Sequence, residues 1–151
     1  MKKFFLLGLM PILALMMSMT FVSCGDDDDD ENSSNPLVGT WKMTESQNNG
    51  DWTMSMTMTL KITETNYTMT QEFTEGDKEH QHKGGNRESG TYTVKDDIIT
   101  AKATSYEYMN DGKWEKEDYT REPQQFRYAI SGKTLTLYSV EGKEPMYVLT
   151  K

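Results

Sequence analysis

The cluster of side chains best suited to bind a metal is Glu79-His80-Gln81-His82. Residues two apart share a face of an extended strand, so His80 and His82 could together bind one zinc ion. A solvated loop is the alternative, because residues 75–89 are polar and rich in glycine, and no third ligand follows at a recognisable spacing. We favour the loop and expect neither a metal nor another cofactor.

Residues that could perform catalysis form no recognisable motif. The serines do not occur in a Gly-x-Ser-x-Gly turn, and no glycine loop of the phosphate-binding kind is present. Carboxylates are plentiful, yet no pair lies in an apolar setting that would separate the two pKa values. The sequence therefore predicts a protein that is not an enzyme.

The single cysteine, Cys24, follows a segment typical of secretory signals. Two lysines precede an apolar stretch, residues 4–17, that is too short to span a bilayer comfortably. Residues 21–24, Phe-Val-Ser-Cys, resemble the lipobox of bacterial lipoproteins. The resemblance implies that residues 1–23 are a signal peptide cleaved after Ser23. It also implies that the acylated Cys24 anchors the chain in a lipid bilayer, since several acyl chains give durable attachment. An ordinary signal peptide with an unrelated cysteine is the alternative.

Residues 24–35 form the predicted tether, which contains the acidic run Asp26–Glu31. Such a run repels itself and buries no apolar surface, so we expect it to be extended and solvated. An acidic run directly after the lipidated cysteine resembles the surface-export signal of Bacteroidota lipoproteins. This implies an outer-membrane lipoprotein exposed on the cell surface. A plain spacer and a domain facing the periplasm are the alternative.

Residues 36–151 are long enough for one domain with a single core and no disulfide. The chain has a net charge of -8. Without the two lysines of the signal and the six acids of the tether, 18 acids and 14 bases remain, or about -4. Nucleic-acid binding usually requires a basic footprint, so we expect no nucleic-acid partner.

Apolar and polar residues alternate with a period of two after Pro36, as in half-buried strands. Residues 52–63 are the clearest case: tryptophan, methionine, leucine and isoleucine occupy one face, and threonine most of the other. The threonines also disfavour a helix. Nine strands are predicted: Leu37–Ser46, Trp52–Thr63, Tyr67–Thr74, Gly90–Lys95, Ile98–Tyr108, Trp114–Arg121, Gln125–Ser131, Thr134–Val140 and Met146–Thr150.

Tight turns between these segments predict an all-β, antiparallel meander. An up-and-down β-barrel of about eight or nine strands removes the unpaired edges most simply, and a β-sandwich is the alternative. We expect residues 75–89 to form a long loop.

Residues 37–41, Leu-Val-Gly-Thr-Trp, contain a Gly-x-Trp similar to the motif that opens the lipocalin barrel. Residues 90–96 and 130–137 resemble the small lipocalin-like lipoproteins of Bacteroidota. The resemblance implies that Trp41 closes the barrel floor against an arginine near the last strand, and that the barrel binds a small apolar or amphipathic molecule. The last strand has no arginine, and Arg127 lies earlier in the chain.

The candidate pocket combines the methionine face with aromatic residues of other strands. Methionine fills irregular core space and also lines adaptable binding surfaces. A barrel of about eight strands is either filled or holds one small ligand, so a pocket and a solid core both remain open. The candidate residues are Trp41, Met54, Met56, Met58, Met69, Phe73, Tyr92, Phe126 and Tyr128.

A filled barrel would leave a structural or interaction module that contacts a protein or a glycan through its loops. Aromatic residues gather around the turn at residues 110–112. They could stack on sugar rings, but pairing across strands is the simpler interpretation. They are Tyr106, Tyr108, Trp114 and Tyr119.

Overall fold

The computed structural model describes residues 35–151 except 78, 111 and 120, and this part of the chain is all β. Its nine strands are β1 (Gly39–Asn49), β2 (Trp52–Ile62), β3 (Asn66–Gly76), β4 (Gln81–Lys95), β5 (Ile98–Asn110), β6 (Lys113–Glu117), β7 (Gln124–Ser131), β8 (Thr134–Ser139) and β9 (Pro145–Thr150). The described part contains no helix long and apolar enough to cross a membrane. The predicted signal peptide, Cys24 and the acidic run lie outside the described residues.

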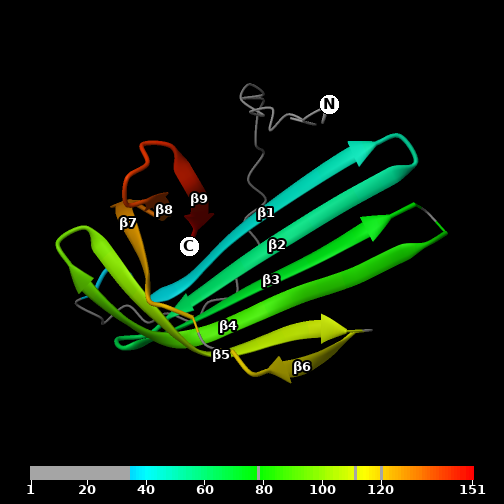
Figure 1. Cartoon of the computed structure of the whole chain (residues 1–151). Helices are drawn as coiled ribbons and strands as arrows, with labels where there is room; N and C mark the ends of the chain where they lie inside the picture. The colour runs from blue at the N-terminus through cyan, green and yellow to red at the C-terminus, as the bar shows by residue number, and fades with distance from the viewer. Residues whose placement is uncertain (1–34, 78, 111, 120) are drawn as a thin grey trace, which may run out of the picture.

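The strands close into an antiparallel barrel, as Figure 1 shows. Eight of them follow one another around the wall in the order β4-β3-β2-β1-β9-β8-β7-β5, and a further pairing of β5 with β4 completes the circle. β6 is an additional strand alongside the end of β5. The predicted up-and-down barrel is confirmed, and the continuous pairing excludes a β-sandwich of two separate sheets.

β5 changes its neighbour along its length. Its first residues, Ile98–Ala101, pair with β7, whereas its last residues, Tyr106–Asn110, pair with β6. On this edge of β5, residues 102–105 pair with neither strand. The connection from β6 to β7 lies outside the sheet. The strand predicted to continue to Arg121 therefore ends at Glu117, and Pro123 within the connection has no backbone N–H to donate to a sheet.

The predicted long loop at residues 75–89 is wrong. β3 continues to Gly76 and β4 begins at Gln81, so most of this stretch is paired strand. Its glycines serve packing, because a side chain at Gly84 would collide with the ring of Phe73 on β3. Glycine in a strand can mark such a close approach, so composition alone gave the wrong element.

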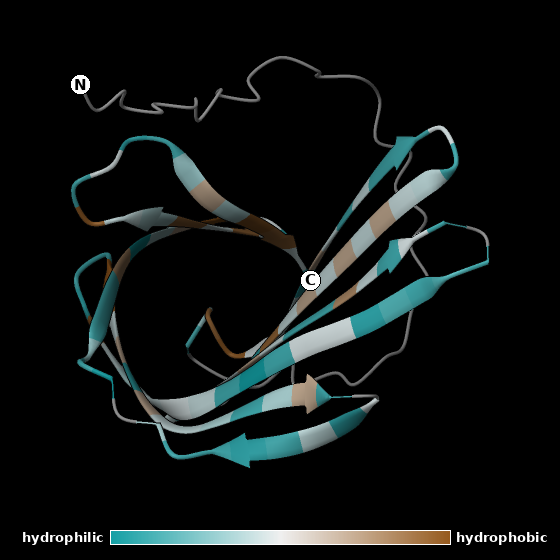
Figure 2. Cartoon of the chain, turned by 45° about the vertical axis from the view of Figure 1, so that its right-hand side comes forward, coloured by the Kyte–Doolittle hydropathy of each residue, from teal (hydrophilic) through white to brown (hydrophobic). Residues whose placement is uncertain are grey.

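The methionine face of β2 points into the barrel, as the alternation predicts. Met58 is only 1% exposed, whereas Thr57 and Thr59 face outward. Met54 and Met56 share the inner face but are half-buried, because the β1–β2 hairpin extends away from the short strands β7–β9 (Figure 1). Figure 2 shows the same alternation of apolar and polar residues along the strands. The fully buried core side chains are Trp41, Leu37, Met58, Leu135 and Leu149.

The barrel floor is closed around Trp41, which is 1% exposed. Its indole Nε1 donates a hydrogen bond to the Leu37 carbonyl at 2.8 Å. The ammonium of Lys151 lies 5.4 Å from the centre of the ring and donates to the Val38 carbonyl at 2.7 Å. A lysine thus supplies the cation where an arginine was expected, and Arg127 lies over Tyr138 instead.

Methionine truncations test how depth in the barrel determines stability. Met58→Ala should cost about 2–5 kcal/mol, because a fully buried side chain leaves a cavity behind. Met54→Ala removes the same atoms from the same face of the same strand, but from a half-buried position, and should cost clearly less. Urea unfolding of both variants measures the difference. Equal losses would contradict the described depth of β2.

Candidate functional site

A cavity of about 70 Å³ lies between the strands of the barrel. Seven strands contribute to its wall, and most of the side chains are apolar. The lining residues are Leu60, Ile62, Tyr67, Met69, Glu88, Tyr92, Ile99, Ala101, Gln124, Phe126, Leu137 and Tyr147.

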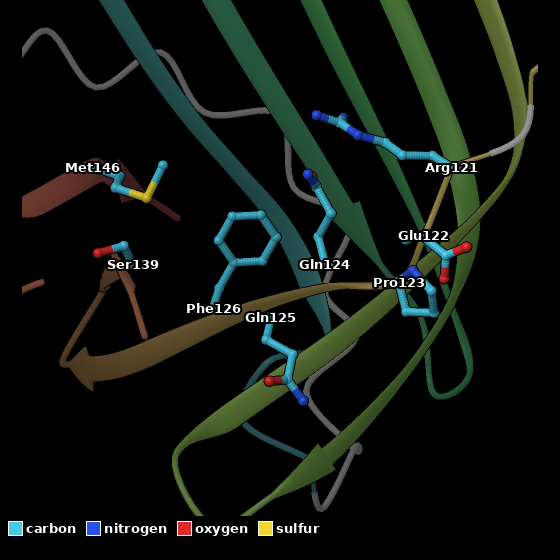
Figure 3. Close-up of a pocket in the computed structure, with 8 residues that line it drawn as sticks. All are labelled: Arg121, Glu122, Pro123, Gln124, Gln125, Phe126, Ser139 and Met146. Carbon is cyan, nitrogen blue, oxygen red and sulfur yellow. The ribbon is translucent and has the colours of Figure 1, made fainter. Parts of the chain in front are cut away.

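A wider, open hollow of about 550 Å³ lies where the β6–β7 connection enters β7, facing β8 and β9 (Figure 3). Its lining residues are Arg121, Glu122, Pro123, Gln124, Gln125, Phe126, Ser139 and Met146. Gln124 and Phe126 line both this hollow and the cavity, so their side chains lie at the junction of the two spaces.

Glu88 on β4 is the buried charged residue of the described chain, at 7% exposed, and it is one of the residues that line the cavity. The hydroxyl of Tyr67 donates to Glu88 Oε1 at 2.7 Å. The hydroxyl of Tyr119 donates to Oε2 at 3.3 Å, and the guanidinium of Arg121 lies 3.7 Å from the same oxygen. Tyr119 and Arg121 both belong to the β6–β7 connection, so Glu88 ties that connection to the barrel wall.

Two of the three tyrosines that line the cavity, Tyr67 and Tyr92, are held in their neutral form. Burial raises the pKa of Tyr67, and the hydrogen bond to Glu88 raises it further, so the hydroxyl stays a donor. Burial also raises the pKa of Tyr92. The Tyr92 hydroxyl donates to the Thr63 carbonyl at 2.7 Å and accepts from the Asn35 amide at 3.0 Å. This contact fixes the entry of the chain into the domain.

The residues predicted to line a pocket fall into three groups in the structure. Met69, Tyr92 and Phe126 line the cavity. Trp41 and Met58 belong to the buried core, and Tyr128 packs against that core. The other three lie on the inner face of the projecting hairpins, half-buried. They are Met54, Met56 and Phe73.

Glu88 was not among the residues predicted to line a pocket, although its spacing from Tyr92 was a usable signal. Glu88 lies four residues before Tyr92, so period-two alternation puts both side chains on one face. Because Glu88 fell within the loop predicted at residues 75–89, the strand alternation was not extended to it. The register now places Glu88 opposite Met69 on β3 and Tyr106 on β5.

His80 lies in the turn between β3 and β4, whereas His82 belongs to β4 and pairs with Glu75. The Asp77 carboxylate accepts hydrogen bonds from the backbone N–H groups of His80 and Glu79, and these lower the pKa of Asp77. His82 lies near the Phe73 ring instead, with 6.2 Å between the ring centres. No group of three potential metal ligands occurs among the residues that the structure describes.

Aromatic side chains beside the β5–β6 turn contact residues of the same chain. Tyr106 stacks on Tyr119 with 4.8 Å between ring centres, on the side of Glu88. Trp114 lies on the outer face, where the guanidinium of Arg87 is 4.2 Å from the ring centre. The Tyr106–Tyr119 stack thus holds the β6–β7 connection against β5, and the Arg87–Trp114 contact joins β4 to β6 across β5.

The sequence matches no protein-family model. No curated protein matches it either.

A pair of tyrosine substitutions tests the hydrogen bonds of Glu88. Tyr67→Phe should cost about 1–3 kcal/mol, because it removes the shortest donor from a buried carboxyl group. Tyr108→Phe is the control: its exposed hydroxyl also donates to a glutamate, Glu115 at 2.8 Å, and its loss should cost less than about 0.5 kcal/mol. Chemical denaturation at neutral pH measures both. A similar loss of stability for the two variants would show that the buried hydrogen bond to Glu88 contributes no more to the free energy of unfolding than the exposed bond does.

Proposed function

We propose that this chain is a membrane-anchored lipoprotein whose lipocalin-like barrel binds one small amphipathic molecule. The supporting observation is the apolar cavity that Glu88 helps to line and that adjoins the open hollow at Gln124 and Phe126. Small-molecule sites are mostly apolar and have a few polar groups that fix orientation. The apolar part of the ligand would enter the cavity, and its polar part would stay near the hollow.

The volumes restrict what can bind. Drug-sized ligands occupy pockets of roughly 300–1,000 Å³, and the cavity of about 70 Å³ is far smaller. Only a narrow group, such as part of an alkyl chain, fits inside, and the rest of the ligand must extend into the hollow. Met69 on the cavity wall is flexible and can adapt to such a chain.

The small volume of the cavity also favours a second candidate, an interaction module with an essentially filled barrel. The β1–β2 and β3–β4 hairpins project away from β7–β9 (Figure 1), and Trp52 at the start of β2 is 40% exposed. In this alternative the hairpins contact a protein or a glycan, and nothing enters the barrel.

Filling the cavity separates the two candidates. Ala101→Leu adds apolar volume to the cavity wall and should abolish binding of the neutral fluorescent probe N-phenyl-1-naphthylamine. Ala129→Leu makes the same change on the exposed face of β7 and should leave the binding unchanged. Fluorescence titration measures both variants, and thermal melts check that they are folded. Full binding by folded Ala101→Leu would rule out the cavity as the site.

The anchor is supported by the lipobox-like residues before Cys24 and by the acidic run after it, both at positions typical of exported lipoproteins. We place the protein in the outer membrane, with the domain on the cell surface. The acyl chains hold it there, and the acidic run separates the barrel from the bilayer.

Cys24→Ala should release the protein from the membrane fraction without changing the fold, because the substitution precedes the first described strand. Fractionation of expressing cells, with circular dichroism of the released protein, measures both effects. Ser33→Ala, between the acidic run and the domain, is the control and should stay with the membrane. Retention of Cys24→Ala in the membrane would disprove the lipid anchor.

A further inference from the structure

We infer that the barrel selects a cationic amphiphile, with an ammonium or amidinium group on a narrow apolar body. The inference rests on the proposed function and names the chemistry of its ligand. It begins from Glu88, an acid placed in the wall of an otherwise largely apolar cavity.

The contacts of Glu88 leave room for another donor. A carboxylate has about four acceptor sites, and two tyrosine hydroxyls occupy two of them. The guanidinium of Arg121 lies 3.7 Å away, beyond a good hydrogen bond, and its side chain is 48% exposed. A ligand cation entering from the hollow can therefore reach Glu88 Oε2, where the existing contacts are long.

Aromatic rings in the same cavity add to this preference. Tyr67, Tyr92, Phe126 and Tyr147 all line it. The face of an aromatic ring attracts a cation, most strongly where water is excluded. A cation near Glu88 thus finds both an acceptor and aromatic neighbours.

Charges are segregated between the two faces of β2–β6. Cross-strand pairing puts Glu117, Tyr106, Glu88 and Met69 in one row on the inner face, and Glu115 in the next row. With Glu75, the inner face of these strands carries four acids and a single lysine, Lys113.

The outer face of the same strands has the opposite sign. Its acids are Glu72 and Glu107. Its bases are Lys61, Lys83, Arg87, Lys95, Lys102 and Lys116. A concave wall of one sign attracts ions of the other sign, so the inner face favours cations over anions.

Arg121 is the base nearest to Glu88 that opposes this preference, since it lines the hollow and lies 3.7 Å from the Glu88 carboxyl group. An anionic ligand could pair with Arg121, but it would also meet Glu88 and Glu122 nearby. The two ligand types therefore predict opposite effects of removing Arg121.

Three compounds with the same chain test the inference: octylammonium, octanol and octanoate, each displacing N-phenyl-1-naphthylamine from the full-length protein at low salt. Octylammonium should bind at least about tenfold more tightly than octanoate, as expected for a charge-assisted hydrogen bond. Added salt should weaken the binding of octylammonium and leave the binding of octanol unchanged.

Charge-removing variants locate the preference. Glu88→Gln should weaken the binding of octylammonium by about tenfold and leave the binding of octanol unchanged. Arg121→Gln should strengthen the binding of octylammonium and weaken the binding of octanoate. Glu72→Gln removes an acid from the outer face of β3 and should change neither compound. If Glu88→Gln does not fold, Glu117→Gln on the exposed inner rim should weaken octylammonium by a smaller factor.

Equal affinities for the three compounds would overturn the inference and leave the proposed function standing. A uniform loss of all three in a folded Glu88→Gln variant would likewise overturn it. If neither the probe nor any octyl compound binds, the proposed function and the inference both fail.

Discussion

The pairing register of the long strands determines what the barrel contains. With a period of two, a shift by one residue would exchange every inward side chain of β2 for its outward neighbour. Met58 would move to solvent and Thr57 or Thr59 into the core. The same register places Glu88 in the cavity and keeps most lysines of these strands outside. The pairing register therefore determines both the packing of the core and the charge on the inner face of the barrel.

The strands with strong alternation could be predicted from the sequence, because their apolar residues fall on one face over many positions. β2 is the best example, and the closed barrel follows from its neighbours having the same pattern. β4 could not be recognised along its full length. Gly84 and Gly85 indicate a loop when they are read locally, and their purpose becomes clear only when Phe73 and Trp114 are placed across from them.

The candidate site was predictable only in part, for a related reason. Aromatic residues and methionines identify an inner face, and Met69, Tyr92 and Phe126 do line the cavity. Glu88 could be assigned to this face only if residues 81–89 had been predicted as part of strand β4. Tyr119 and Arg121 required the path of a connection outside the sheet, which no periodicity describes. Lys151 against Trp41 depends on the meeting of two segments far apart in the sequence.

The seam between β1 and β9 has a consequence for how the domain forms. One register pair, Lys42 with Thr150, joins these strands across 108 positions of sequence. During synthesis β1 appears first, and its free edge stays unpaired until almost the whole domain has been made. An unpaired edge is a template for another chain, and contacts this distant form slowly. A slow approach of β9 to β1 would therefore lower the yield of correctly folded protein without changing the stability of the finished barrel.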